Sequence, residues 1–287
     1  MKEIELTAYA KINFAIDLLG KRVDGYNDVK MIMQTIDLSD KVYIEKIDTG
    51  IEVVSDIKIV SSSDKNIAYK AAEHMIKRYN IKSGVKIEIK KGIPISAGLG
   101  GGSADAAAVI IGMNKLFDLG LNDKELRALG KELGADVPFC IMRNTALAQG
   151  IGERLIPLPD IVDMDLIIIK PCFGVSTKEV YESFDYNEPK RRPDFEILID
   201  AISKRDILGI AKNMANVLES VTEKNFPVIA DIKDRLIKNR ALGAMMSGSG
   251  PSVFGIFESS SVAQAAYKAM ANKGDYHCYL AKTVCFR

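Results

Sequence analysis

The sequence is poor in the residues that most often carry metal or thiol chemistry. It has two histidines and four cysteines in 287 residues. The cysteines are widely spaced and form no Cys-x-x-Cys pair, which argues against a zinc site or a disulfide framework. His74 falls in an amphipathic helical pattern and His277 in a late strand, and neither has a companion at metal-ligand or triad spacing. A general base is therefore expected to be a carboxylate or a lysine.

Neither a large net charge nor a long apolar run is present. Lys plus Arg total 39 and Asp plus Glu total 38, so the formal charge of +1 indicates no basic surface for nucleic acid. The longest apolar run, residues 106–113, is far shorter than the roughly 18 residues of a membrane span. The N-terminus lacks the basic start and apolar core of a signal peptide. We therefore expect a cytoplasmic protein with no nucleic-acid or membrane partner.

A glycine-rich segment at residues 94–105 is the most informative stretch. Before it, Val85, Ile87 and Ile89 alternate with charged residues, which predicts a half-buried strand, and after it apolar residues recur at helical spacing. A glycine loop between a strand and a helix can bring backbone N–H groups and the positive end of the helix dipole to an anion. That geometry suits a polyphosphate. The alternative is a tight loop whose glycines only permit close packing.

Three better-known phosphate loops do not fit this segment. A P-loop needs a lysine after its last glycine, whereas Gly102 is followed by Ser103 and Ala104. A dinucleotide fingerprint would need a third glycine in place of Ser103 and a strand after the helix, but residues 122–133 predict another helix. The protein-kinase motifs His-Arg-Asp and Asp-Phe-Gly are absent from the sequence.

Two polar positions near the N-terminus are candidates for function. In the extended pattern of residues 4–18, Lys11 and Asn13 share the polar face. Residues 20–27 then predict a polar turn that holds Tyr26 between a glycine and an amide. Such a turn could clamp a flat ring or simply cover the core. On local evidence alone, Lys11 is most simply interpreted as a solvated charge.

Asp136 is a third candidate, because it follows a predicted helix at a sharp change of direction. Pro138 disfavours helical backbone at the preceding residue, so Val137 is predicted to be extended. Asp136 would then lie between a helix end and a strand. A carboxylate gains nothing from the dipole at a helix C-terminus, which hints at a function. The local alternative is an ordinary turn-forming aspartate.

The second half of the chain predicts an α/β sandwich. Residues 165–170 predict a buried strand, and residues 185–194 predict a mobile surface loop. Near the end, residues 246–251 form a second glycine turn, followed by a strand, a helix and a last strand. Two glycine turns, one in each half, would allow a ligand to be gripped between domains. We expect one domain at residues 1–160 and another at 161–287.

Together these stretches resemble the family of small-molecule kinases named after galactokinase, homoserine kinase, mevalonate kinase and phosphomevalonate kinase. Residues 94–104 match its central signature, a proline followed by Gly-Leu-Gly and small residues, and residues 246–251 resemble its C-terminal glycine motif. The motifs at residues 8–13, 24–26, 100–105 and 134–138 resemble one branch, which phosphorylates a cytidine diphosphate alcohol in isoprenoid biosynthesis. The likeness covers essentially the whole chain.

The resemblance implies a fold and a reaction. The fold is α+β, with an N-terminal domain similar to the second domain of ribosomal protein S5, a ferredoxin-like C-terminal domain, and the active site in the cleft between them. The reaction is transfer of the ATP γ-phosphoryl group, with Mg²⁺, to a hydroxyl on the erythritol part of the substrate. Asp136 would accept the hydroxyl proton, and Lys11 would be the cation beside it. No protein-held metal site is implied, and a monomer or weak dimer is expected.

The resemblance also implies binding residues. Asn13, Tyr26, Asn27 and Tyr181 are expected at the substrate. Asn27 stands where the family usually has a histidine that hydrogen-bonds cytosine, and its amide offers both a donor and an acceptor. A kinase of another small alcohol and a non-catalytic nucleotide-binding regulator are the alternative functions. The residues expected at the nucleotide are Asn66, Lys91, Pro94, Ile95, Ser96, Ala97, Gly98, Leu99, Gly100, Gly101, Gly102, Ser103 and Ala104.

Overall fold

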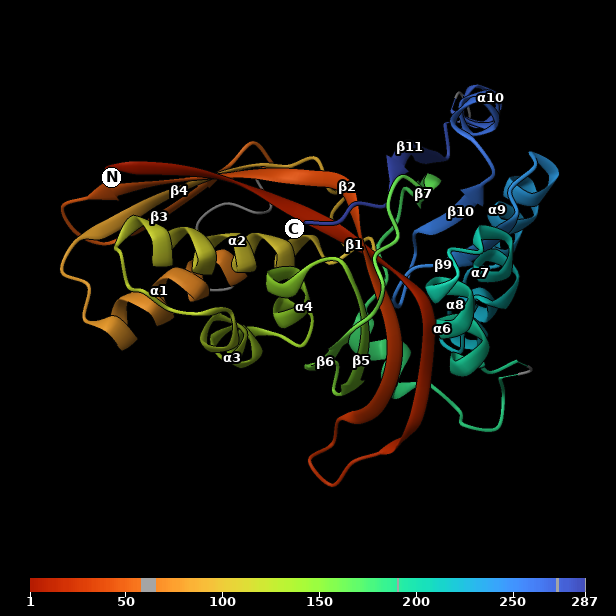
Figure 1. The fold of residues 1–287 in the computed structure, drawn as a ribbon, viewed down its shortest axis with the longest axis horizontal. Coiled ribbons are helices and arrows are strands. Elements are labelled where there is room, and N and C mark those ends of the chain that lie inside the picture. The colour runs from red at the N-terminus through yellow and green to blue at the C-terminus, as the bar shows by residue number, and fades with distance from the viewer. Residues whose placement is uncertain (58–65, 190, 272–273, 287) are drawn as a thin grey trace. The chain divides into compact units, whose positions relative to one another are not determined.

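Two units, each built from several separate stretches of chain, make up the protein in this computed structural model (Figure 1). The structure describes residues 1–57, 66–189, 191–271 and 274–286. The first unit comprises residues 1–10, 38–95 and 100–142, and the second comprises residues 11–37, 96–99 and 143–287. The long strands β1 (Glu3–Lys21) and β2 (Asn27–Ile47) contribute residues to both units. The domain boundary expected near residue 160 stays a prediction.

The first unit is a sheet with its helices on one face (Figure 1). Strand β3 (Ile51–Ser55) runs parallel to β4 (Gly84–Lys90), which pairs antiparallel with β2, the neighbour of β1. The helices are α1 (Ile67–Tyr79), α2 (Gly101–Leu116), α3 (Asp123–Leu133) and α4 (Val137–Met142). The strand and the helix predicted on either side of the glycine segment are confirmed.

Burial explains why these residues form these elements. Ile87 and Ile89 of β4 are fully buried, whereas Glu88 between them is exposed, as the alternating pattern predicts. Helix α2 is buried along most of its length. It lies so close to the sheet that a Cβ on Gly112 would come within 2.5 Å of the Ile44 side chain. This close packing holds α2, the helix that follows the glycine segment, against the sheet.

The second unit contains a four-stranded antiparallel sheet in the order β11-β7-β10-β9. Helix α9 (Val228–Lys238) packs on β9 and β10, and α10 (Ser260–Met270) packs on β7, β10 and β11. Phe254 of β10 contacts Phe14 of β1 edge to face, with ring centroids 6.4 Å apart. The strands are β7 (Asp165–Pro171), β9 (Gly243–Met246), β10 (Val253–Phe257) and β11 (Tyr276–Lys282), which confirms the predicted late strand-helix-strand order and the α+β class.

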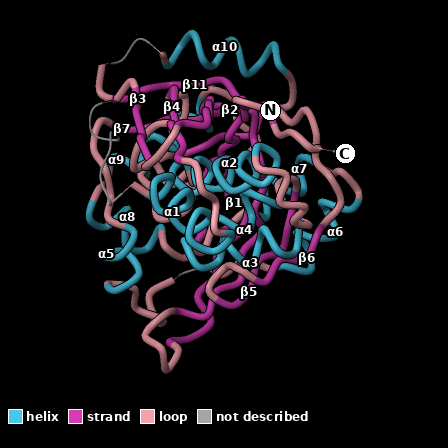
Figure 2. Tube along the Cα trace, turned by 90° about the vertical axis from the view of Figure 1, so that its left-hand side faces the viewer, coloured by secondary structure: helices cyan, strands magenta, loops and turns pink. Residues whose placement is uncertain are grey.

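Three further strands of the second unit extend the sheet that contains β1 and β2. Strand β5 (Thr145–Gly150) pairs antiparallel with β2 and with β6 (Arg154–Pro157), and β8 (Ala215–Asn216) runs parallel to β1. Figure 2 distinguishes the helices from the strands along the chain. Within the described residues, no helix has both the length and the apolar character needed to cross a membrane. The other helices are α5 (Thr177–Glu182), α6 (Phe195–Ser203), α7 (Ile207–Asn213) and α8 (Glu219–Asn225).

Candidate active site

The glycine segment forms a tight loop between β4 and α2. Gly98 and Gly100 both have a φ of 73°, a left-handed conformation that favours glycine. Gly101 and Gly102 already belong to α2, and the Ala104 N–H donates to the Gly100 carbonyl at 2.8 Å. The N–H groups of the first turn are those that a helix leaves without internal acceptors. The segment therefore has the backbone geometry of an anion-binding loop.

The tip of this segment, residues 96–99, packs directly against the second glycine turn, residues 246–251. A Cβ on Gly98 would lie 2.2 Å from the Ser247 carbonyl oxygen, and the Ser247 hydroxyl donates to the Gly98 carbonyl at 3.1 Å. The Ser252 N–H donates to the Ala97 carbonyl at 3.3 Å. Tip and turn belong to the same unit. The glycines thus bring the two backbones into contact, and the expectation that the two turns grip a ligand between domains stays a prediction.

A buried asparagine that the sequence did not single out holds the second turn. Asn216 is 4% exposed, and its amide nitrogen donates to the Met246 carbonyl at 2.9 Å and the Gly248 carbonyl at 2.8 Å. The Met246 N–H donates in turn to the Glu219 carboxylate at 2.8 Å. Burial raises the pKa of Glu219, while the neighbouring ammonium of Lys233 opposes that shift. No local pattern marks Asn216, because it lies in a two-residue strand.

Lys11 and Asn13 lie beside the tip. The Lys11 N–H donates to the Leu99 carbonyl at 3.0 Å, and the Lys11 ammonium donates to the Asn13 side-chain oxygen at 2.9 Å. Lys11 is 4% exposed and Asn13 is fully buried. The solvated-charge interpretation of Lys11 is therefore wrong. A buried ammonium stabilises a negative charge beside it better than an exposed ammonium does.

Asp136 lies in the first unit, at the beginning of a helix and not of a strand. Its carbonyl accepts from the Cys140 N–H at 3.1 Å, so Asp136 immediately precedes α4. Val137 is helical, and the prediction of extended backbone there is wrong. Proline is tolerated in the first turn of a helix, so Pro138 begins α4 instead of opposing it. Asp136 thus stands at the N-terminal end of α4, the end of a helix at which acidic side chains are common.

Tyr26 and Asn27 lie where the hairpin between β1 and β2 turns. Tyr26 is 61% exposed, so its ring is accessible to a ligand. The Asn27 side-chain oxygen accepts from the Tyr186 hydroxyl at 2.6 Å. Desolvation raises the pKa of Tyr186, which keeps the phenol protonated as a donor. Because the amide oxygen is engaged, the Asn27 nitrogen is the group that can donate to a ligand.

Tyr186 belongs to residues 185–194, which the sequence predicts to be a mobile surface loop. Besides the Tyr186 contact, Arg192 forms an ion pair with Asp17 of β1 and donates to the Leu18 carbonyl at 3.2 Å. The loop is thus anchored to the hairpin at two points. Tyr181 lies on α5, whose first residue, Thr177, shares a hydrogen bond of 2.9 Å with Ser249 of the second glycine turn.

Asn66 and Lys91 have clear structural roles. The Asn66 side chain caps α1 by accepting from the Ala68 N–H at 2.8 Å. Lys91 is buried, and its ammonium contacts the carboxylates of Asp40 at 2.5 Å and Asp105 at 2.8 Å. Neither aspartate was expected in the site from the sequence. Among the residues that the structure describes, no group of three or more His, Cys, Asp or Glu side chains is arranged to hold a metal ion.

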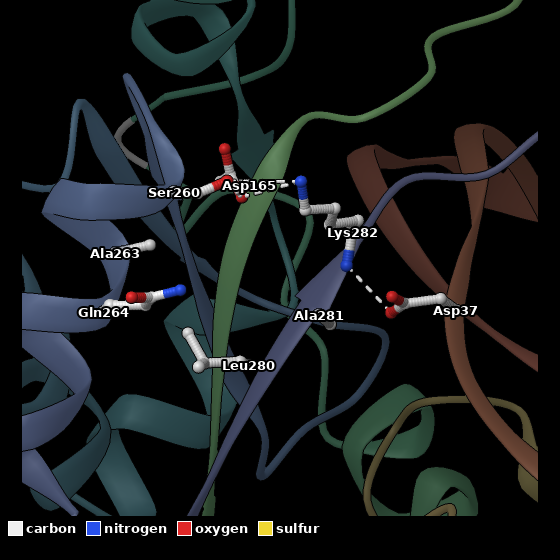
Figure 3. A pocket seen from close by; sticks show the side chains of 8 residues that line it. All are labelled: Asp37, Asp165, Ser260, Ala263, Gln264, Leu280, Ala281 and Lys282. Atoms are coloured by element: carbon white, nitrogen blue, oxygen red, sulfur yellow. Dashed lines mark hydrogen bonds and ion pairs between the residues drawn. The ribbon is translucent and has the colours of Figure 1, made fainter.

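A separate hollow near β11 does not qualify as the site (Figure 3). The Asp37 carboxylate accepts from the Lys282 N–H at 2.8 Å. Asp165 accepts from the Ser260 hydroxyl at 2.7 Å and lies 3.4 Å from the Lys282 ammonium. These polar groups pair with one another, so they are not poised to receive a ligand.

Comparison with known families and proteins agrees with the glycine motifs. The family model described as "GHMP kinases N terminal domain" matches residues 66–144, and the one described as "GHMP kinases C terminal" matches residues 198–275. A 4-diphosphocytidyl-2-C-methyl-D-erythritol kinase from Acetivibrio thermocellus is 52% identical, over 99% of this chain and 100% of its own length. One from Clostridium perfringens strain 13 is 46% identical, over 98% of both chains.

Solved structures show the same likeness. A crystal structure of 4-(cytidine 5'-diphospho)-2C-methyl-D-erythritol kinase superposes with a TM-score of 0.85 at 29% identity, covering 99% of this chain and 100% of that one. Homoserine kinase from Cytophaga hutchinsonii shares the fold, with a TM-score of 0.75 at 21% identity, over 99% of this chain and 98% of its own. The two-domain kinase fold expected from the sequence is confirmed.

Proposed function

The chain belongs to the GHMP kinases, and we propose that it transfers the γ-phosphoryl group of ATP to the 2-hydroxyl of 4-diphosphocytidyl-2-C-methyl-D-erythritol. The relatives that are about half identical over nearly the full chain carry this activity in their names. The product would enter the non-mevalonate route to isoprenoid precursors. We expect the enzyme to act in the cytoplasm as a monomer or weak dimer, with small molecules as its partners.

The contact of Lys11 with the glycine tip is the structural observation that carries this proposal. The Lys11 backbone is hydrogen-bonded to Leu99, and its buried ammonium is hydrogen-bonded to Asn13. A cation is thereby held beside the loop whose backbone suits a triphosphate. Phosphoryl transfer depends on positioning and charge neutralisation more than on covalent catalysis, so this pairing favours a kinase over a simple nucleotide-binding protein.

The proposed chemical step uses one carboxylate and one ammonium. The Asp136 carboxylate accepts the proton of the substrate hydroxyl while the oxygen of that hydroxyl forms a bond to the γ-phosphorus. The bond from the γ-phosphorus to the β,γ-bridging oxygen breaks, and ADP leaves with that electron pair. The Lys11 ammonium stabilises the negative charge that is spread over the transferring group. Mg²⁺ bound with ATP would supply further charge neutralisation.

In this proposal, different residues bind the nucleotide and the cytidine moiety of the substrate. Residues 94–104 bind the triphosphate of ATP through backbone N–H groups, and Ser103 lies near the phosphates. Asn66 and Lys91 belong to the same nucleotide site. Asn13 contacts the reacting end of the substrate. Tyr26 and Tyr181 pack on the cytosine ring. The Asn27 side-chain nitrogen donates a hydrogen bond to an acceptor on the cytosine edge, because the Asn27 oxygen already accepts from Tyr186.

A substrate comparison tests the proposal. Purified protein is supplied with MgATP and either 4-diphosphocytidyl-2-C-methyl-D-erythritol, mevalonate or homoserine, and ADP release is followed. We expect kcat/KM for the cytidine compound to exceed that for either other alcohol by roughly a thousandfold or more, because only it can use the cytidine contacts. Equal rates with all three would reject this substrate. ATP binding without ADP release in the presence of any of the three alcohols would indicate a non-catalytic nucleotide-binding regulator.

A further inference from the structure

Three ionisable side chains that are distant in sequence meet beside the glycine segment, and we call them the ion cluster: Asp40, Lys91 and Asp105. Asp40 comes from β2, Lys91 follows β4, and Asp105 lies in α2. The Lys91 ammonium contacts an oxygen of Asp40 at 2.5 Å and one of Asp105 at 2.8 Å. The three side chains are between 0 and 4% exposed. Solvent therefore does not screen these charges.

The ion cluster is bonded to both flanks of the glycine segment, which are residues 91–93 before it and residues 101–105 at its end. The second oxygen of Asp40 accepts the N–H groups of Gly92 and Ile93, both at 2.7 Å. This fixes the backbone that leads into Pro94. On the other flank, Asp105 lies just after the first turn of α2. The flanks also approach each other, because a Cβ on Gly101 would lie 3.6 Å from the Lys91 ammonium.

The charge balance of the ion cluster is unusual. Desolvation raises the pKa of Asp105 to about 8, although the Lys91 ammonium opposes the shift. Desolvation lowers the pKa of Lys91, but the two aspartates together outweigh it and raise that pKa, so Lys91 stays charged. One oxygen of Asp105 is buried without any hydrogen-bond partner. Apolar residues of similar size would usually be at least as stable in such a place, so stability alone does not account for these charges.

We propose that the ion cluster is a positioning device, which holds the two flanks of the glycine segment at the spacing that binds the nucleotide phosphates. Asp40 and Asp105 are thereby positioning residues for the phosphoryl donor, and Lys91 acts by bridging them. This inference rests on the proposed function, because it takes the glycine segment as the triphosphate site. It differs from a direct role of Lys91, in which the ammonium itself contacts the nucleotide.

Two variants distinguish bridging from direct contact. Lys91→Met removes the ammonium that joins Asp40 to Asp105 and leaves one oxygen of each aspartate buried without that partner, so the flanks should separate and the Kd for an ATP analogue should rise about tenfold. The double variant Lys91→Met/Asp105→Leu replaces the unpartnered Asp105 by an apolar side chain that can pack against the methionine, and the shorter methionine leaves room for the leucine. Asp40 keeps its two backbone donors in both variants. The Kd of the double variant should return to within about threefold of the wild type.

Titration calorimetry with a non-hydrolysable ATP analogue measures these affinities without any alcohol substrate. Lys90→Met, at the exposed neighbouring lysine, is the matched control and should bind normally. A double variant as weak as Lys91→Met, or a Lys91→Met with normal affinity, would overturn the proposal. If Lys91→Met does not fold, the double variant alone decides, since tenfold weaker binding contradicts bridging. A wrong alcohol substrate would leave all these affinities unchanged, so the two failures are distinguishable.

Discussion

The tip and the flanks of the glycine segment are held by different interactions. At the tip, the backbone of Gly98 touches the backbone of the second glycine turn, and the contact needs no charged side chain. At the flanks, a buried lysine bridges two aspartates. Backbone contact demands glycine and so leaves a visible motif, whereas the ion cluster joins scattered residues. We therefore expect the tip to be intolerant of any added atom, and the flanks to respond to charge and pH.

The largest effect is expected from Gly98→Ala. The new Cβ would lie 2.2 Å from the Ser247 oxygen, and the φ of 73° already disfavours alanine. We expect the free energy of unfolding to fall by about 4 kcal/mol, because strain and overpacking add. Urea denaturation measures the loss. Gly120→Ala is the control, since its φ is 68° but no atom lies within 4 Å, and it should lose only about 1–2 kcal/mol. Equal losses would contradict the tip contact.

Asp40→Ala should have the next largest effect, at the flank. It leaves the N–H groups of Gly92 and Ile93 without their acceptor and removes one partner of Lys91. We expect a loss of about 3 kcal/mol in the free energy of unfolding. Asp56→Ala provides the control, because exposed Asp56 accepts from the Lys91 N–H at 3.1 Å and from the Ser55 hydroxyl at 3.3 Å, and its loss should cost about 1 kcal/mol or less. Comparable losses would show that Asp40 is not specially placed.

Asp105→Asn should change how stability depends on pH. Because burial raises the pKa of Asp105 to about 8, the folded protein holds a proton that the unfolded chain releases near pH 4. Stability therefore falls as pH rises from about 4 to about 8 and is then constant, as far as this group is concerned. Lys91 stays charged throughout that window. The asparagine side chain of the variant cannot ionise. The Tm of the variant minus that of the wild type should therefore increase by roughly a few degrees between pH 5 and pH 9. A constant difference would refute the buried proton.

Ser247→Ala should have the smallest effect and sharpens the comparison at the tip. It removes only the hydroxyl that donates to the Gly98 carbonyl at 3.1 Å and leaves the backbone contact in place. We expect a loss of about 1 kcal/mol. Ser203→Ala, which removes an exposed hydroxyl donating to the Ile199 carbonyl, should cost nearly nothing. A loss at Ser247 as large as that of Gly98→Ala would mean that the side chain, not the glycine backbone, holds the tip.

The sequence predicted those parts of the site that depend on local chemistry. The alternation at residues 85–89 and the glycines after it correctly indicated a strand, a loop and helix α2. Pro138 misled, because the same residue that disfavours helix before it is well tolerated in a first turn. The backbone contact of Lys11 with Leu99, the amide of Asn216 and the partners of Lys91 join residues far apart in sequence. Such contacts have no periodic signal, so only the folded chain reveals them.

The most direct test of the catalytic account is the effect of Asp136→Ala on turnover and on nucleotide affinity, measured on the same preparation. If Asp136 accepts the hydroxyl proton, kcat should fall by about a hundredfold or more. The Kd for an ATP analogue should stay within about twofold of the wild type, because the carboxylate is needed mainly in the transition state. A kcat within about threefold of the wild type, with the 4-diphosphocytidyl-2-C-methyl-D-erythritol substrate saturating, would contradict the account.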